Sequence, residues 1–598
     1  MHRRELLKGL GALALTPACL TPLQAQTAGK PSARRVRPAD PEWPSEARWA
    51  ELDQEVGGNL LKVEAPFAGC AVDLKGEACK AEVADIRNPF ALRDLPGGTQ
   101  VSGWLDAWRP AASAYAVKAR SSGDVAAAVN FARDHNLRLV VKGTGHSYLG
   151  TSNAPDSLLI WTRAMDDVTL HDAFLPQGGE GRMAPCAAVS VGSGAVWIDL
   201  YHKVTTEAGR YVQGGGCADV GVAGLVQSGG FGSLSKGFGT AAASLLEAEI
   251  VTADGVARIA NPFVNAELFW ALKGGGGGSW GVVTRLTLRT HELPPFIGAA
   301  WGSIMASSDD AFLRLLQHFF AFYAENLLNP HWGEQVAIEP DNTLGVFMVC
   351  QGLDNSTTAA TWAPFFDWVK ASPGDYALKG AGAGARGSRR FWEVAGNPFM
   401  IADSRPGARA YHGWWKGDQE QVGMFLHGYE SLWLPAALLQ EGERARLADA
   451  LLAASRHKKV ELHFNKGLAG APAEAIAAAK APATNPAVTE AFALAIIAGG
   501  ERPRYPGLPQ GDNADLSAAK SDAEAIDAAT AELARVAPAS GSYVSESNYF
   551  NKQWQTAYWG DNYGRLRAVK AKYDPDGLFF VHHGVGSEDW SEDGFARL

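Results

Sequence analysis

Three glycine-rich stretches constrain the fold of this 598-residue chain more than any other feature. The densest covers residues 211–232, with eight glycines in 22 residues and Cys217 directly after three of them. A second, residues 142–150, reads "KGTGHSYLG" and contains His146, and a third is the five-glycine run 274–278. Glycine costs about 1 kcal/mol inside a helix or strand, so regular structure does not account for this density. The pattern predicts a ligand that lies against the backbone of these stretches.

The stretch around His146 follows "LRLVV", an apolar run typical of a buried strand. A glycine turn after such a strand lets backbone N–H groups approach an anion, most often a phosphate. The turn lacks the G-K-[ST] ending of a nucleotide hydrolase. Ser279 lies in a G-x-S-x-G match at residues 277–281, but the alternating pattern that follows predicts a strand, where a nucleophile elbow needs a helix. No Cys/His cluster has zinc spacing.

Charge and length narrow the class of protein further. The chain carries 54 Lys and Arg against 64 Asp and Glu, a formal net charge of −10, which argues against nucleic acid or an anionic membrane surface as a partner. Its length favours two domains.

The N-terminus has the pattern of an export signal. Arg3 and Arg4 precede a short apolar run, which predicts a twin-arginine signal over residues 1–28, its export machinery as a partner and a periplasmic or secreted protein. The run is too short for a stable membrane span. Residues 26–43 read as a flexible lead-in. Cys70 and Cys79 are the natural disulfide pair, whereas Cys186 and Cys350 are expected to be buried or free.

The middle of the chain alternates between helix and strand signals. Ser121 or Ser122 can cap a helix ahead of the strand at "LRLVV", and Asp254-Gly255 predicts a hairpin turn. Residues from about 295 to 540 contain most of the long, Ala-rich helical patterns. Asp574-Pro575 ends a last basic helix.

Four motifs carry a resemblance to a known family: "GHSYLG", "GGGCADVGVAG", "KGGGGGSWGVVTRLTLRTH" and "YWGDNYGRLRAVKAKYDPDGLFF". The chain resembles the vanillyl-alcohol oxidase superfamily of flavoproteins in its berberine-bridge-enzyme-like branch, closest to a fungal-type secreted subgroup, from about residue 42 to the end. The resemblance implies an α+β fold. It has a two-part PCMH-type FAD-binding domain at residues 111–294 and 541–598, an N-terminal extension at 29–110, and a substrate domain at 295–540 with an antiparallel sheet backed by helices.

The resemblance also implies where the cofactor binds. His146 would attach to the flavin 8α-methyl group and Cys217 to flavin C6, making the FAD bicovalent. Val220 matches a position near flavin C4a where valine is associated with oxygen access, which favours an oxidase over a dehydrogenase. The remaining expected FAD contacts are Lys142, Gly143, Thr144, Gly145, Ser147, Gly150, Gly216, Gly221, Gly224, Ser228, Gly229, Gly232, Gly277, Gly281, Val282, Val283 and Asn548.

The chain departs from the family pattern where a base is expected. The plant-type branch has "YxNY", whose last tyrosine is the base, whereas this chain reads "YVSE" and ends in Glu546. Glu546 is therefore either the base or a salt-bridged structural residue. Tyr148 and Tyr543 are further catalytic candidates. Phe231 replaces a family tyrosine, Asp219 stands where relatives often have threonine, and Trp414, His463 and Lys466 are candidate contacts from the middle segment.

The resulting functional hypothesis is an exported oxidase with bicovalent FAD. It would take hydride from an alcohol or sugar hydroxyl carbon and reduce molecular oxygen to hydrogen peroxide. The alternatives are oxidation or oxidative cyclisation of an amine or phenolic small molecule, a dehydrogenase with another electron acceptor, and an exported binding protein without catalysis.

Overall fold

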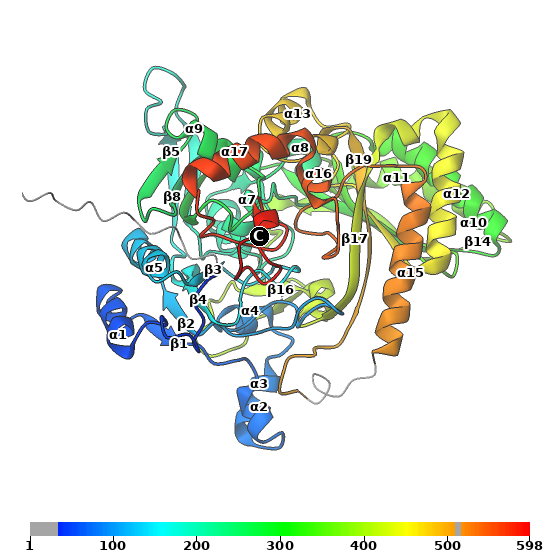
Figure 1. Cartoon of the computed structure of the whole chain (residues 1–598). Coiled ribbons are helices and arrows are strands. Elements are labelled where there is room, and N and C mark those ends of the chain that lie inside the picture. Colours follow the sequence, from blue (N-terminus) through cyan, green and yellow to red (C-terminus); the bar gives the residue numbers. More distant parts are fainter. Residues whose placement is uncertain (1–33, 509–515) are drawn as a thin grey trace, which may run out of the picture. The chain divides into compact units, whose positions relative to one another are not determined.

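The computed structural model describes residues 34–508 and 516–598 (Figure 1). The expected export signal in residues 1–28 lies outside these residues. Among the helices of the described chain, none is both long and apolar enough to cross a bilayer.

The first sheet places the loop of His146. Ser121 caps helix α5, because its side-chain oxygen accepts a hydrogen bond from the backbone N–H of Asp124 at 3.2 Å, as the sequence predicted. The helix leads into a buried strand that ends at Lys142, directly before the glycine turn. The strand order is β1-β2-β4-β3, with the last three parallel. The bounds are β1 Leu60–Lys62, β2 Tyr115–Lys118, α5 Ser122–Asp134, β3 Arg138–Lys142 and β4 Ser157–Trp161.

The second sheet is antiparallel and holds the other two glycine-rich stretches at its ends. Its order is β5-β6-β10-β8-β9, and β7 also pairs with β10. The hairpin predicted at Asp254-Gly255 is confirmed between β8 and β9. The bounds are β5 Val168–Phe174, β6 Cys186–Gly192, β7 Arg210–Val212, α7 Val222–Gln227, β8 Leu245–Val251, β9 Ala257–Ala260, α9 Ala266–Leu272 and β10 Val282–Glu292.

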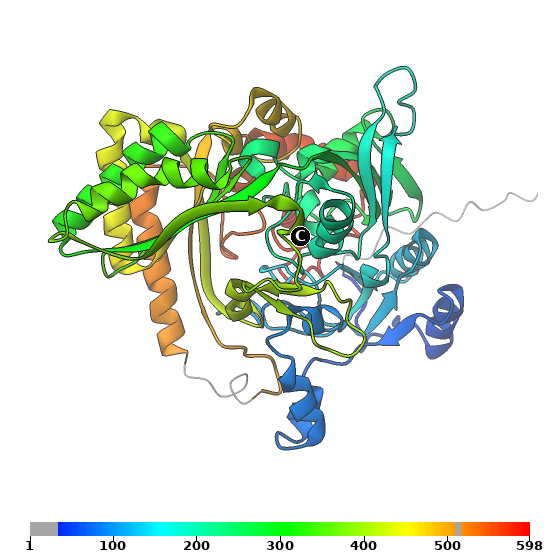
Figure 2. The ribbon, with the colours of Figure 1, turned by 180° about the vertical axis from the view of Figure 1, so that it is seen from behind.

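The third sheet is fully antiparallel, in the order β14-β11-β13-β12-β18-β19-β17. Four helices cover one face (Figure 2) and bury side chains such as Ala300, Val336 and Leu462. This arrangement confirms the predicted fold class. The bounds are β11 Phe296–Ala306, α10 Asp309–Phe322, β12 Trp332–Ile338, β13 Thr343–Gln351, α11 Asn355–Lys370, β14 Tyr376–Gly387, β17 Phe425–Pro435, α12 Glu441–His457, β18 Val460–His463, β19 Ala491–Glu501 and α15 Ser517–Ala534.

The uncovered face of this sheet carries a cross-strand row of side chains. Trp301 pairs with Phe347, Phe347 with Gln335, and Gln335 with His463. Because successive strand residues point to opposite faces, this row lies opposite the helices. The face therefore remains available for a ligand.

The chain ends close to the first sheet. Helix α16 (Trp554–Trp559) precedes α17 (Tyr563–Tyr573), whose end at Asp574 confirms the predicted stop. Phe579 then bridges to β3. The lead-in was expected to be flexible up to residue 43, and its described part is instead fixed. The backbone N–H of Arg35 donates to the carbonyl of Phe595 at 2.8 Å, and that of Val36 donates to Asn136 at 3.0 Å.

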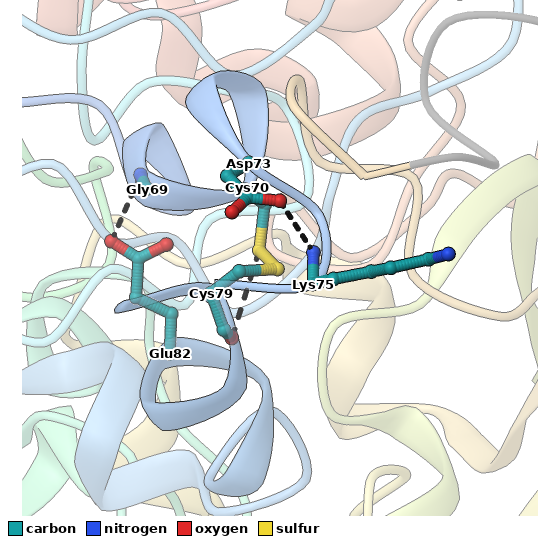
Figure 3. The surroundings of a disulfide bond; sticks show 6 residues. All are labelled: Gly69, Cys70, Asp73, Lys75, Cys79 and Glu82. Atoms are coloured by element: carbon teal, nitrogen blue, oxygen red, sulfur yellow. Dashed lines mark hydrogen bonds between the residues drawn. A yellow bond between two sulfur atoms is a disulfide. The ribbon is translucent and has the colours of Figure 1, made fainter. Parts of the chain in front are cut away.

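The predicted disulfide is present between Cys70 and Cys79, and Figure 3 shows it joining helices α2 (Ala68–Val72) and α3 (Glu77–Ala84). The carboxylate of Glu82 in α3 accepts a hydrogen bond from the backbone N–H of Gly69 in α2, which is a second contact between the same two helices. Within the described residues, Cys186, Cys217 and Cys350 are free thiols, and Cys350 is buried.

Candidate active site

One cavity of about 2320 Å³ contains the glycine-rich stretches and the open face of the third sheet in its walls. His146 and Cys217, far apart in sequence, both line it. Two contacts join their loops. The Nε2 atom of His146 lies 2.5 Å from Oδ2 of buried Asp219, and the backbone N–H of Gly221 donates to the Thr144 hydroxyl at 3.1 Å. The two segments therefore form one wall.

Most of the predicted site residues lie on this cavity. Those from the first and third glycine-rich stretches are Lys142, Gly143, Thr144, Gly145, His146, Ser147, Tyr148, Gly277, Gly281 and Val283. Those from the second stretch and the later chain are Gly216, Cys217, Val220, Gly221, Gly224, Ser228, Gly232, His463, Lys466, Tyr543 and Glu546.

Four predicted cofactor residues are not part of the cavity wall. Gly150 packs under Trp108, where an added Cβ would lie 2.5 Å from the indole ring. Gly229 packs against Thr484. Val282 belongs to the apolar core under the first sheet. The Asn548 side chain is bound to Glu430, which its amide contacts at 2.5 Å.

The wall has room and unsatisfied polar atoms for a large ligand such as FAD. A Cβ added at Gly224 would meet nothing within 4 Å, and one at Gly216 or Gly277 would come no closer than 3.8 Å to another heavy atom. Two buried side-chain oxygens in the lining, Ser193 Oγ and Gln227 Oε1, have no partner among the described residues. Such atoms need a ligand or water. The residues present therefore fit a bound dinucleotide. No sequence motif had pointed to Ser193 or Gln227.

Other glycines serve contacts between backbone segments. An added Cβ at Gly214 would lie 1.9 Å from the ring of Trp197, and one at Gly232 would lie 1.8 Å from the carbonyl oxygen of Gly214. These positions admit no side chain. Part of the glycine density thus reflects loop packing as well as ligand contact.

Lys142 has a structural contact besides its place in the cavity. Its ammonium group donates to the carbonyls of Leu95 at 2.6 Å, Pro96 at 3.0 Å and Gly98 at 2.5 Å. Burial lowers the pKa of Lys142 to about 7. The side chain ties residues 95–98 to the start of the His146 loop.

Glu546 forms an ion pair with Lys466, and both line the cavity. Of the two roles that the sequence left open, the salt bridge is observed. Burial raises the pKa of the Tyr148 phenol, and the nearby Glu546 carboxylate adds to the effect. The same two causes raise the pKa of Tyr429, whose ring lies 5.1 Å from that of Tyr148. Both phenols stay protonated at neutral pH and can donate hydrogen bonds.

Tyr543 is a buried residue of the cavity wall. Its ring meets the edge of Phe231 with centroids 5.1 Å apart, and burial raises the pKa of its phenol. Of the middle-segment candidates, His463 and Lys466 are on the wall. Trp414 is not, because it is buried in the apolar core. Its neighbour Trp415 faces the cavity instead, and its indole N–H donates to the carbonyl of Gly216 at 3.0 Å.

Asp418 is a further residue of the cavity that no sequence motif indicated. This residue lies in the 3-10 helix Lys416–Gln421 and lines the cavity. Burial raises its pKa to about 7, and the carboxyl group of Asp219 adds to the effect. A carboxyl group with this pKa can exchange protons at neutral pH.

The G-x-S-x-G match around Ser279 does not form a hydrolase site. Ser279 is buried, its hydroxyl has no partner in the part of the chain that is described, and β10 follows it three residues later, so no nucleophile elbow forms. No group of three or more metal-ligating side chains occurs within residues 34–508 and 516–598.

Comparison with known families identifies two segments. An FAD binding domain matches residues 113–260, and a berberine and berberine-like segment matches residues 542–586. Among curated proteins, the VAO-type flavoprotein oxidase VAO615 of Thermothelomyces thermophilus is 28% identical over 94% of this chain and 95% of its own length. The FAD-linked oxidoreductase asqF of Emericella nidulans is 35% identical over 43% of this chain and 48% of its own length.

Solved structures share the fold. The VAO-type flavoprotein MtVAO615 from Myceliophthora thermophila C1 is 25% identical and superposes with a TM-score of 0.77 over 94% of this chain and all of that one. A glucooligosaccharide oxidase from Acremonium strictum, described with a 6-S-cysteinyl, 8α-N1-histidyl FAD, is 19% identical with a TM-score of 0.61 over 85% of this chain and 98% of that one. With the matched FAD-binding segment and the glycine-walled cavity, these findings show an FAD-dependent oxidoreductase that is similar to the vanillyl-alcohol-oxidase-type and berberine-bridge-enzyme-like flavoproteins.

Proposed function

We propose that the protein is an exported oxidase whose FAD is joined to both His146 and Cys217. Its donor is an alcohol or a sugar hydroxyl carbon, and dioxygen is reduced to hydrogen peroxide. The observation that carries this proposal is that His146 and Cys217 line the same glycine-walled cavity. The doubly attached flavin of the glucooligosaccharide oxidase, which has the same fold, supports it.

Bound FAD would supply the hydride acceptor, and the residues of this chain would bind and orient the donor. Glu546 accepts the donor hydroxyl proton, and its ion pair with Lys466 holds the carboxylate in position. Tyr148 and Tyr429 hold the donor oxygen by hydrogen bonds from their phenols. Asp219 orients the His146 ring.

Export is supported by the pattern of residues 1–28 and by the disulfide, because disulfides persist in oxidising compartments. We therefore place the mature enzyme in the periplasm or outside the cell. Cell fractionation tests this: retention in the cytoplasm after Arg3 and Arg4 are both changed to Lys, with export of the parent chain, is the expected result.

Acid precipitation and a donor panel test the chemistry. We expect the precipitated protein to stay yellow, and digestion to give two peptides, one with His146 and one with Cys217, joined through the same flavin. Anaerobic mixing with sugars and alcohols should bleach the flavin, and air should restore it with release of hydrogen peroxide. A colourless precipitate would contradict covalent attachment, and bleaching by none of these donors would contradict the donor class.

One observation favours amines as a second donor class. The cavity contains the carboxyl groups of Asp219, Glu334, Asp418 and Glu546, which would attract a cationic nitrogen. Amines in the same panel test this candidate: faster bleaching by amines than by alcohols would favour it.

A further inference from the structure

The carboxyl group of Asp418 has an environment that the proposed oxidation does not use. Its Oδ2 atom is buried and has no hydrogen-bond partner among the described residues, although the residue lines the cavity. Buried polar atoms in native proteins are almost always paired, so an unpaired carboxylate oxygen in a cavity is a candidate for a chemical role.

The local structure holds Asp418 against the Cys217 loop. Trp415, three residues earlier, donates its indole N–H to the carbonyl of Gly216, the residue directly before Cys217. The backbone N–H of Lys416 donates to the carbonyl of Phe399 at 2.9 Å. The turn that carries Asp418 is therefore fastened at its start to the segment that carries the thiol.

The two side chains also influence each other's titration. Burial raises the pKa of the Cys217 thiol, and Asp418 is the first neighbour that adds to this effect, both by its charge and by a hydrogen bond with the thiol. A buried thiol of this kind is a poor nucleophile unless a base removes its proton, because only the thiolate reacts.

The other carboxyl groups near the thiol are less suited to this task. Asp219 is bound to His146 at 2.5 Å, and Glu546 is paired with Lys466. The effect of Glu334 on the Cys217 thiol is weaker than those of Asp418 and Asp219. Asp418 combines a free oxygen with a contact to the thiol.

We propose that Asp418 is the base that removes the Cys217 proton when the thiol couples to the flavin, an inference that rests on the proposed double attachment. The Cys217 S–H bond and the flavin C6–H bond break, and the Sγ–C6 bond forms. The thiol proton passes to Asp418, and the two protons and two electrons lost overall reduce dioxygen to hydrogen peroxide. Thiol, FAD and dioxygen thus give thioether-linked FAD and hydrogen peroxide.

Flavin loading of full-length protein tests this. Apoprotein made under riboflavin limitation is mixed with FAD in air, samples are quenched in acid, and mass spectrometry after digestion counts the flavin bonds at His146 and at Cys217. We expect Asp418→Asn to slow bond formation at Cys217 at least ~10-fold, with His146 attachment unchanged. Asp172→Asn, the same change at an exposed position on β5 away from the cavity wall, should load at the parent rate.

The pH dependence of loading separates a base from a structural residue. In Asp418→Asn the thiol must ionise unaided, so raising the pH should speed Cys217 coupling more in this variant than in the parent. The other titratable groups facing the thiol are unchanged in both proteins: His146, Tyr148, Tyr201, Asp219, Glu334 and Tyr429.

The outcomes are distinguishable. Cys217 coupling in Asp418→Asn at the parent rate would overturn the inference alone. Parent protein with flavin at His146 only would contradict the proposed double attachment and the inference with it. If Asp418→Asn fails to bind FAD, Asp418→Ala provides the test: slowed Cys217 coupling with normal His146 attachment supports the inference, and coupling at the parent rate overturns it.

Discussion

The Nε2 atom of His146 and Oδ2 of Asp219 are 2.5 Å apart, a contact that links the loops of the two expected flavin-attachment residues. The contact leaves Nδ1, the other ring nitrogen, available for attachment and fixes the plane of the ring. Asp219 thus supplies a carboxyl partner to the imidazole ring.

Removing this partner should reduce attachment at His146. Hydrogen bonds to charged groups contribute about 1.5–3 kcal/mol, so we expect Asp219→Asn to slow His146 attachment roughly tenfold or more. The loading assay on digested protein measures this. Asp172→Asn, an exposed change on β5, should have no effect. Unchanged His146 attachment in Asp219→Asn would show that the ring is oriented by other contacts.

The ion pair between Lys466 and Glu546 predicts that both residues support turnover. Glu546→Gln removes the proposed base and should lower kcat/KM by about 10²-fold or more. Lys466→Met removes the partner that holds the carboxylate in place and should lower kcat/KM by a smaller factor. Steady-state turnover of the two variants and the parent with the same donor measures both effects. A kcat/KM of the parent size in Glu546→Gln would assign the base elsewhere.

Val220 should control the reaction with oxygen. A larger side chain at this place in the cavity would narrow the approach of dioxygen, so Val220→Leu should reoxidise more slowly than the parent after anaerobic reduction. Bleaching by the donor, measured first in the same stopped-flow experiment, is the internal control and should be unchanged. Equal reoxidation rates would mean that oxygen reaches the flavin by another path.

Glu430 predicts that stability falls as the pH rises. Burial raises the pKa of Glu430 to about 7, above its ordinary value of 4.5. The folded state therefore holds a proton between these pH values that the unfolded state has released, and stability is lost as the pH rises toward 7. The shift corresponds to an upper bound of about 3 kcal/mol.

Glu430→Gln should lose less stability between pH 4.5 and pH 8 than the parent, measured by urea unfolding at both values. Glu441→Gln, an exposed change on α12, serves as the control and should follow the parent. Equal loss in Glu430→Gln and the parent would mean that this carboxyl group is ionised in the fold.

The sequence predicted the parts of the fold that depend on neighbouring residues. The Ser121 cap, the hairpin at Asp254-Gly255 and the end of α17 at Asp574 each depend on local chemistry. The glycine density near Cys217 predicted a ligand site because no local structure explains it.

The residues that the sequence missed depend on contacts between separate parts of the chain. Tyr429 reaches the cavity because β17 pairs with β19. Asp418 follows β16 (Gly413–Trp415), and the hydrogen bond from Trp415 to Gly216 holds its turn against the Cys217 loop. Trp414 was assigned to the site, but Trp415 faces the cavity. Strand residues alternate between faces, so an error of one position exchanges a core residue for a wall residue. Pattern alone does not fix that register.

Two parts of the cavity wall differ in what they are made of. At Gly232 the wall is backbone packed on backbone, because an added Cβ would lie 1.8 Å from the carbonyl oxygen of Gly214, so a side chain there would separate the loops. The sheet part of the wall is made of side chains, among them those of Trp301, Phe347 and Gln335. A designer who wishes to retarget this enzyme should leave the glycine part alone and vary the sheet part.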